Sequence, residues 1–115
     1  MESILTSIKK LLGITEAYEH FDSDIVMHIN TSLSTLSQLG VGPSTGFFIE
    51  DKLATWNDFV PNSVLVNLAK QYVYLKVRLV FDPPQSSTVI EAMNRQISEL
   101  EWRMNVEVGS TITKR

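Results

Sequence analysis

The stretch that decides the fold is residues 62–81, which read NSVLVNLAKQYVYLKVRLVF. At 100° per residue, one face of a helix over this stretch collects six largely apolar side chains: Leu65, Leu68, Ala69, Tyr72, Leu75 and Leu79. Five valines widen that face, and polar residues gather on one narrow strip. A helix that is apolar nearly all round is a buried helix. The β-branched residues leave a strand open, but the length and the lack of alternation favour a central helix.

The chain after this helix predicts a sharp stop and then a second long helix. Asp82-Pro83-Pro84 ends the central helix, because a residue that precedes proline avoids helical backbone angles. Thr88 with Glu91 has the spacing of a capping box at the next helix start. One face of that helix carries Val89, Met93, Ile97, Leu100 and Met104, and we expect its end near Asn105.

The chain before the central helix predicts two more helices. Residues 2–12 have apolar side chains at helical spacing and stop at Gly13. A longer helix begins after an N-cap at Asp22 or Ser23 and stops at Gly40. Its apolar stripe is Ile25, Ile29, Leu33 and Leu36.

Turn residues dominate the segment between the second helix and the central helix. Glycines and a proline fill residues 40–46, and the apolar Phe47-Phe48-Ile49 follows them. Thr55 can cap one helical turn over residues 55–59, and Pro61 can open the central helix at its first position. The predicted fold is therefore all-α: a small bundle of about four helices with a long loop or short β-arm before the central helix. We expect one domain over residues 1–105 and a flexible tail over residues 106–115.

Composition limits the function classes. The chain has 115 residues, 10 basic and 13 acidic, and its net charge of −3 argues against tight binding to a nucleic acid backbone. The absence of cysteine excludes disulfides and thiolate metal sites. Lys9 and Lys10 interrupt the early apolar run, and no segment approaches the ~20 apolar residues of a membrane span. We expect no membrane association.

No group of residues predicts catalysis. His20 and His28 have no further ligands at zinc-like spacing, so both are expected to be surface residues. The glycine-rich residues 40–46 lack the lysine of a phosphate-binding loop. We therefore predict a non-enzyme without cofactor or metal.

Several residues instead suggest contacts with other proteins. The outer face of the second helix is polar but uncharged, which favours burial against a neighbour, although an ordinary surface fits equally well. Trp102 lies off the apolar stripe of the last helix, near Arg95, as in an interface hot spot; the tail folding back over it is the other interpretation. Phe47 and Phe48 either cover the domain's own helices or insert into another chain. The candidate contact residues on the second helix are Thr31, Ser34, Thr35 and Gln38.

Lys76 is the candidate for a buried charge. It falls within the apolar stripe of the central helix, between Tyr72 and Leu79. A lysine there must pair its ammonium with a carboxylate or extend it to the edge of the core.

Five segments resemble one known family. They are residues 24–30 (DIVMHIN), 38–43 (QLGVGP), 55–59 (TWNDF), 74–84 (YLKVRLVFDPP) and 99–105 (ELEWRMN). Together they are similar to the small head–tail connector proteins of tailed phages and of prophages of Gram-positive bacteria. The helix that ends in Asp-Pro-Pro, followed by the Glu-Trp-Arg helix, is the most specific part.

The resemblance implies a helical, non-catalytic virion protein. Such proteins form a ring, of about twelve copies, on the phage portal protein. The ring extends the DNA channel, lets double-stranded DNA pass without tight binding, and offers a surface to the next connector or tail protein. The resemblance also implies synthesis in the host cytoplasm before assembly into the virion. A small adaptor or regulatory protein that acts as a monomer or dimer is the alternative.

Overall fold

Five helices follow one another along residues 2–113, the part of the chain that the computed structural model describes; side chains are described through residue 109. They are α1 (Ile4–Leu11), α2 (Asp22–Gln38), α3 (Trp56–Phe59), α4 (Ser63–Phe81) and α5 (Ser87–Thr113). The described residues form no strand. The predicted all-α bundle is confirmed, with the single turn α3 added to the four longer helices.

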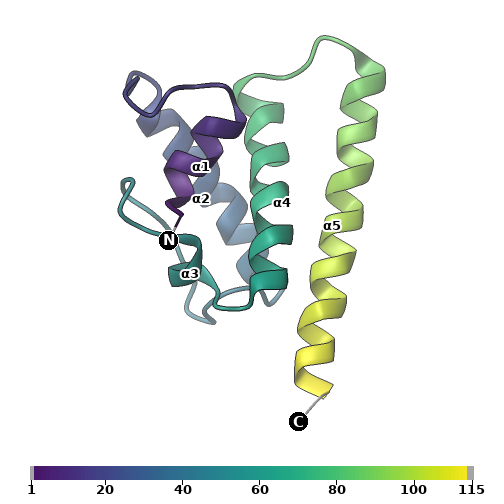
Figure 1. Cartoon of the computed structure of the whole chain (residues 1–115). Coiled ribbons are helices and arrows are strands. Elements are labelled where there is room, and N and C mark those ends of the chain that lie inside the picture. Colours follow the sequence, from purple (N-terminus) through teal and green to yellow (C-terminus); the bar gives the residue numbers. More distant parts are fainter. Residues whose placement is uncertain (1, 114–115) are drawn as a thin grey trace.

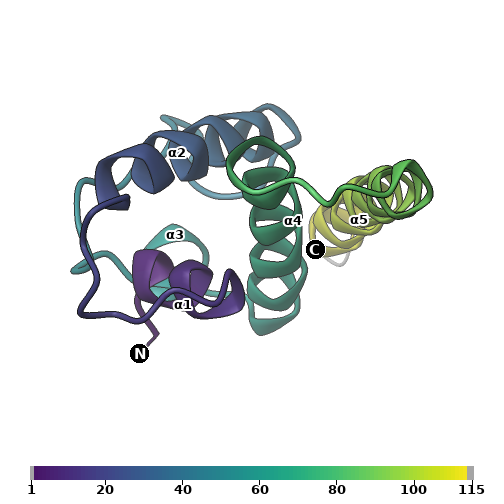
Figure 2. The same ribbon diagram turned by 90° about the horizontal axis from the view of Figure 1, so that it is seen from above.

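The predicted central helix, α4, is the middle of the structure. Figures 1 and 2 show α1 and α2 on one side of α4 and α5 on the other. Buried side chains from all five helices form one apolar cluster. The apolar stripe predicted for the last helix is buried at Met93, Ile97, Leu100 and Met104, whereas Val89 is exposed. Because α5 packs chiefly on α4, most of its circumference faces outward.

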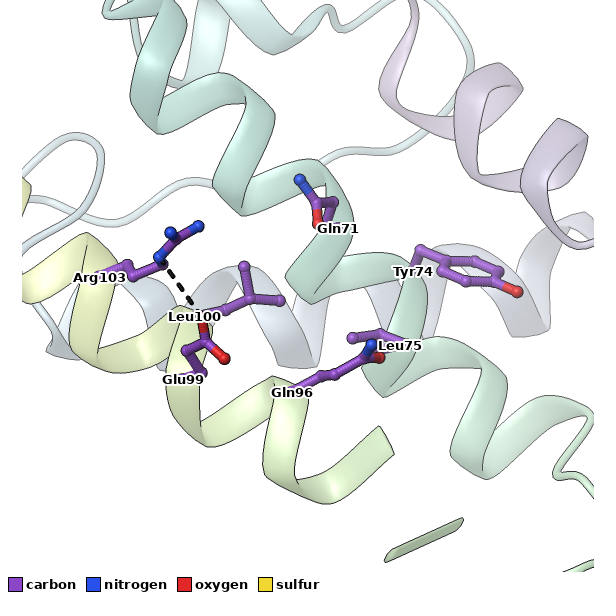
Figure 3. A pocket seen from close by; sticks show the side chains of 7 residues that line it. All are labelled: Gln71, Tyr74, Leu75, Gln96, Glu99, Leu100 and Arg103. Atoms are coloured by element: carbon purple, nitrogen blue, oxygen red, sulfur yellow. Dashed lines mark ion pairs between the residues drawn. The ribbon is translucent and has the colours of Figure 1, made fainter. Parts of the chain in front are cut away.

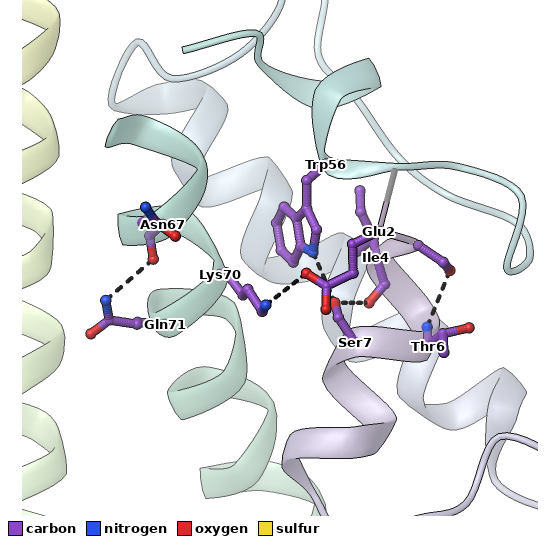
Figure 4. A network of polar contacts seen from close by, with 9 residues as sticks. Glu2, Ile4, Thr6, Ser7, Trp56, Asn67, Lys70 and Gln71 are labelled. Atoms are coloured by element: carbon purple, nitrogen blue, oxygen red, sulfur yellow. Dashed lines mark hydrogen bonds and ion pairs between the residues drawn. The ribbon is translucent and has the colours of Figure 1, made fainter. Parts of the chain in front are cut away.

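The N-terminus is held to the body by a polar network beside α1 (Figure 4). The Trp56 indole nitrogen donates a hydrogen bond to Ser7 Oγ at 2.8 Å, and that hydroxyl donates to the Ile4 carbonyl at 3.0 Å. Lys70 Nζ lies 2.7 Å from a carboxylate oxygen of Glu2. Trp56 is 1% exposed, so this single turn of helix supplies one of the largest side chains of the core.

Residues 40–55 form a long loop, which is one of the two alternatives predicted for this segment, the other being a short β-arm. The only extended pairing within the described residues is an isolated bridge between Ser3 and Thr55, so the prediction of a β-arm is wrong. The prediction for Thr55 is confirmed, since its hydroxyl accepts from the Asp58 amide and its own amide donates to the Asp58 carboxylate. Gly42 must be glycine: its φ is +90°, and a Cβ there would lie 2.5 Å from the Phe59 ring.

Three of the predicted helix starts are wrong by one or two residues. α2 has Phe21 at its N-cap, whose side chain has no hydrogen-bond acceptor, and Asp22, one of the two predicted caps, pairs with Lys9 instead. Asn62 caps α4 by accepting from the Val64 and Leu65 amides, so Pro61 lies outside that helix. α5 starts at Ser87, before Thr88, and Ser86 accepts from the Val89 amide.

The end of the last helix is also corrected. α5 continues to Thr113, past the predicted end at Asn105. Val108, four residues after the buried Met104, packs against the core cluster near Gly40. The predicted tail therefore contributes a further turn of the apolar stripe. Flexibility of this tail in solution stays a prediction, and Lys114 and Arg115 lie outside the described residues.

Candidate functional site

The outer face of α2 is the first surface without a partner in the monomer. Thr31, Ser34 and Gln38 are exposed and Thr35 is half-buried, and together they line a shallow groove along the helix. The hydroxyl of Thr31 donates to the Met27 carbonyl at 3.1 Å, and that of Thr35 donates to the Thr31 carbonyl at 3.3 Å. Because these donors are satisfied within α2, burying this face leaves neither hydroxyl without a hydrogen bond.

The two phenylalanines of the loop have different surroundings. The Phe47 ring is half-buried and lies 5.4 Å from the Phe59 ring, centroid to centroid. Phe48 is 69% exposed. Asn30 fixes the loop beside them, since its amide group donates to the Ile49 carbonyl and accepts from the Ile49 amide. Phe47 therefore covers the domain's own core, and Phe48 is available to another chain.

Trp102 is the second unpartnered feature. Its side chain lies opposite the buried stripe of α5 and is 66% exposed, and no side chain described through residue 109 covers it. Arg95 is exposed on the same face, two helical turns earlier. Val64 and Val106, each about half exposed, line a shallow groove with Trp102. Its placement off the core face agrees with the sequence pattern, while a role in binding stays a prediction.

A half-open cleft between α4 and α5 continues from this patch (Figure 3). Leu75 and Leu100 are buried at its base. Its rim is polar, and Arg103 Nε lies 3.5 Å from a carboxylate oxygen of Glu99. The remaining lining residues are Gln71, Tyr74 and Gln96. Sequence reasoning missed this cleft, because it exists only when the polar strip of α4 is placed beside one flank of α5.

The buried charge of the fold is Lys9, whereas the predicted Lys76 is half-buried. Lys76 Nζ lies 5.8 Å from the centroid of the Tyr72 ring, a cation–π contact. Lys9 is 2% exposed. Its ammonium lies 2.8 Å from Asp22 Oδ1 and donates to the carbonyls of Glu16 and Tyr18 at 3.0 and 2.7 Å. Lys9 therefore holds the segment that connects α1 to α2 against the end of α1.

One polar contact joins α4 to α5 beneath these surfaces. The hydroxyl of the buried Tyr72 donates to Glu101 Oε2 at 2.8 Å. Burial, followed by the hydrogen bond to Glu101 and its negative charge, raises the pKa of Tyr72 well above its ordinary value. The contact joins the two helices at the residue that precedes Trp102, and the buried stripe of α5 packs in the same core.

The described residues include no group of three or more histidine, cysteine, aspartate or glutamate side chains that could hold a metal ion. None of the helices described combines the length and the hydropathy that crossing a bilayer requires.

Comparison with known proteins gives one result. Residues 4–111 match the family model described as phage connector protein. No curated protein and no solved structure matches the chain. The matched range runs from the first residue of α1 nearly to the end of α5, and so includes every surface described above.

Proposed function

Because the chain belongs to the phage connector protein family, a family of structural virion proteins, we propose that it is one subunit of a ring-shaped head–tail connector. In this proposal the ring, of about twelve copies, docks on the portal protein and extends the DNA channel. Its far side offers the attachment surface for the next connector or tail protein. The subunit is made in the bacterial host and ends in the virion.

The observation that supports this proposal is the pair of unpartnered surfaces on a well-packed monomer. A head-to-tail ring needs two different patches on each subunit, because each copy contacts one neighbour on either side. The outer face of α2 supplies one such patch, and the flank of α4 and α5 around Trp102 supplies the other. An adaptor that binds a single partner needs only one.

Charge supports passage of DNA without tight binding. The net charge is −3, and a protein that holds the phosphate backbone would present clustered lysines and arginines. Among the described residues, carboxylates within the fold pair with Lys9, Lys70 and Arg103 of the ten basic side chains. The subunit can therefore stand beside DNA without holding it.

Deleting the gene in the phage that encodes the chain tests the proposal. We expect DNA-packaging heads and complete tails that fail to join, and restoration of joined particles by the gene supplied in trans. Electron microscopy of restored particles should place a ring of this protein between portal and tail. Joined, infectious particles in the deletion strain, or a protein absent from purified particles, would contradict it.

A further inference from the structure

We propose that neighbouring subunits meet by seating the outer face of α2 of one copy in the α4–α5 groove of the next copy. This inference rests on the proposed ring. The groove is the surface formed by the cleft of Figure 3 and the adjoining patch around Trp102, which share Arg103 in their lining. The occupant to which it commits is a second copy of this chain.

The two surfaces lie on different helices and share no residue. Figure 4 shows Gln71, at the rim of the groove, on the flank of α4 toward α5, whereas Lys70 reaches Glu2 from the flank toward α1. Figures 1 and 2 show α2 on one side of α4 and α5, which forms the other wall of the groove, on the other side. The outer face of α2 points away from the core, because its buried residues are on the other side of that helix. A copy can therefore receive one neighbour in its groove while its α2 enters the other neighbour, as a closed ring requires.

Length and charge fit a second copy. From Val64 to Tyr74 the groove wall spans about 15 Å, and from Met27 to Gln38 the α2 face spans about 17 Å, at a rise of 1.5 Å per residue. The α2 face carries no charged side chain among those that line its shallow groove. Of the charged residues that line the receiving groove, Glu99 and Arg103 pair with each other and Glu107 lies at one end, so the uncharged face of α2 meets no unpaired charge at the cleft. An uncharged face is a poor match for the phosphates of DNA.

Surface chemistry also suits helix docking. The floor of the groove is apolar, with Leu68, Leu75 and Leu100, and Trp102 stands at its edge. The small side chains at the middle of the α2 face permit close approach of two helices. Met27 is 56% exposed at one end of that face and can fill the apolar part of the groove beside Trp102.

The proposed contact between neighbouring copies is small, so we expect it to form only where many copies are held together. A helix face of about 17 Å by 10 Å covers roughly 170 Å² in projection, and even twice that area is below the ~800 Å² per partner of a standard interface. Two free copies should therefore separate, and the contact should persist where the portal gathers many copies. The experiment accordingly uses assembled particles.

The absence of cysteine from the chain permits a clean cross-linking test. Particles carrying the double variant Ser34→Cys with Gln71→Cys, treated with a flexible bismaleimide reagent, should yield a ladder of covalent multimers. Neither single variant should yield the ladder. The matched control, Ser34→Cys with Asn57→Cys, places its second thiol on an exposed residue of α3 away from the groove and should yield no ladder.

The outcomes separate this inference from the proposed function. Covalent dimers from Ser34→Cys alone would indicate that two α2 faces meet, which overturns head-to-tail seating. Incorporation of the double variant into particles without multimers would overturn the seating and leave the connector function standing. Absence of the unmodified protein from particles would overturn both. Circular dichroism of each variant, matching that of the natural chain, establishes that the substitutions leave the fold intact.

Discussion

Replacing each tryptophan by alanine should separate the fold of this connector from its assembly. Trp102 is largely exposed, and alanine regains about 0.5 kcal/mol of helix propensity, so Trp102→Ala should change the free energy of unfolding by less than ~1 kcal/mol. Trp56 is buried and hydrogen-bonded to Ser7, so Trp56→Ala should cost about 3–5 kcal/mol. At about 4 °C per kcal/mol for a chain of this size, the melting temperature should fall by roughly 12–20 °C for Trp56→Ala alone.

Assembly should show the opposite order of effects, compared at a temperature where both variants are folded. Truncating an interface tryptophan costs on the order of 2 kcal/mol, which is about a thirty-fold loss of affinity at each contact. Trp102→Ala should therefore keep its helical circular dichroism while its amount in purified particles falls, whereas folded Trp56→Ala should still incorporate. The reasoning is refuted if Trp102→Ala unfolds, or if it enters particles as well as the natural chain does.

Three further substitutions test the internal contacts. Lys9→Met leaves the Asp22 carboxylate without its ammonium and should lower the free energy of unfolding by about 3 kcal/mol in urea titrations, whereas Lys10→Met should have no measurable effect. Gly42→Ala should destabilise by more than Gly46→Ala in the same assay, because both need a positive φ but only Gly42 faces a ring; equal losses would exclude the steric clash. Tyr72→Phe should cost about 1 kcal/mol at neutral pH. Since the folded pKa of Tyr72 is raised, stability of the natural chain should also fall above its unfolded value near pH 10, a loss that the phenylalanine variant should lack.

Periodicity and capping predicted most of the helices, because those signals are local. The capping turn at Thr55, the stop at Asp82 and the stripe from Met93 to Met104 needed only neighbouring residues to be interpreted. The predictions were wrong where the local structure depends on a segment that is distant in the sequence. Burial of Lys9 depends on the link between α1 and α2 folding back over it, and the extra turns of α5 depend on the packing of Val108 beside Gly40.

The candidate surfaces were predictable to different degrees for the same reason. Residues on one helix share a face by spacing alone, so the uncharged side of α2 and the outward direction of Trp102 could be derived from the sequence. The groove could not, since its two walls are 21 or more residues apart in the chain and meet only after α5 packs on α4. Phe47 and Phe48, which the sequence did not distinguish, also differ through a distant segment, because Phe47 lies against Phe59 of α3 while Phe48 stays exposed.

The geometry of α4 has a consequence for the size of the proposed ring. In a closed head-to-tail ring, the rotation that carries one subunit onto the next is a full turn divided by the copy number, about 30° for twelve copies. That rotation is fixed by the angle between the two contact surfaces. Both surfaces are positioned by α4, because α2 packs on one side of it and α5 on the other. The Tyr72–Glu101 hydrogen bond holds α5 in place on that helix. A loosened α5 should therefore widen the spread of angles, so that Glu101→Ala produces rings of mixed copy number in electron micrographs, while a uniform ring of unchanged size would show that the portal alone sets the symmetry.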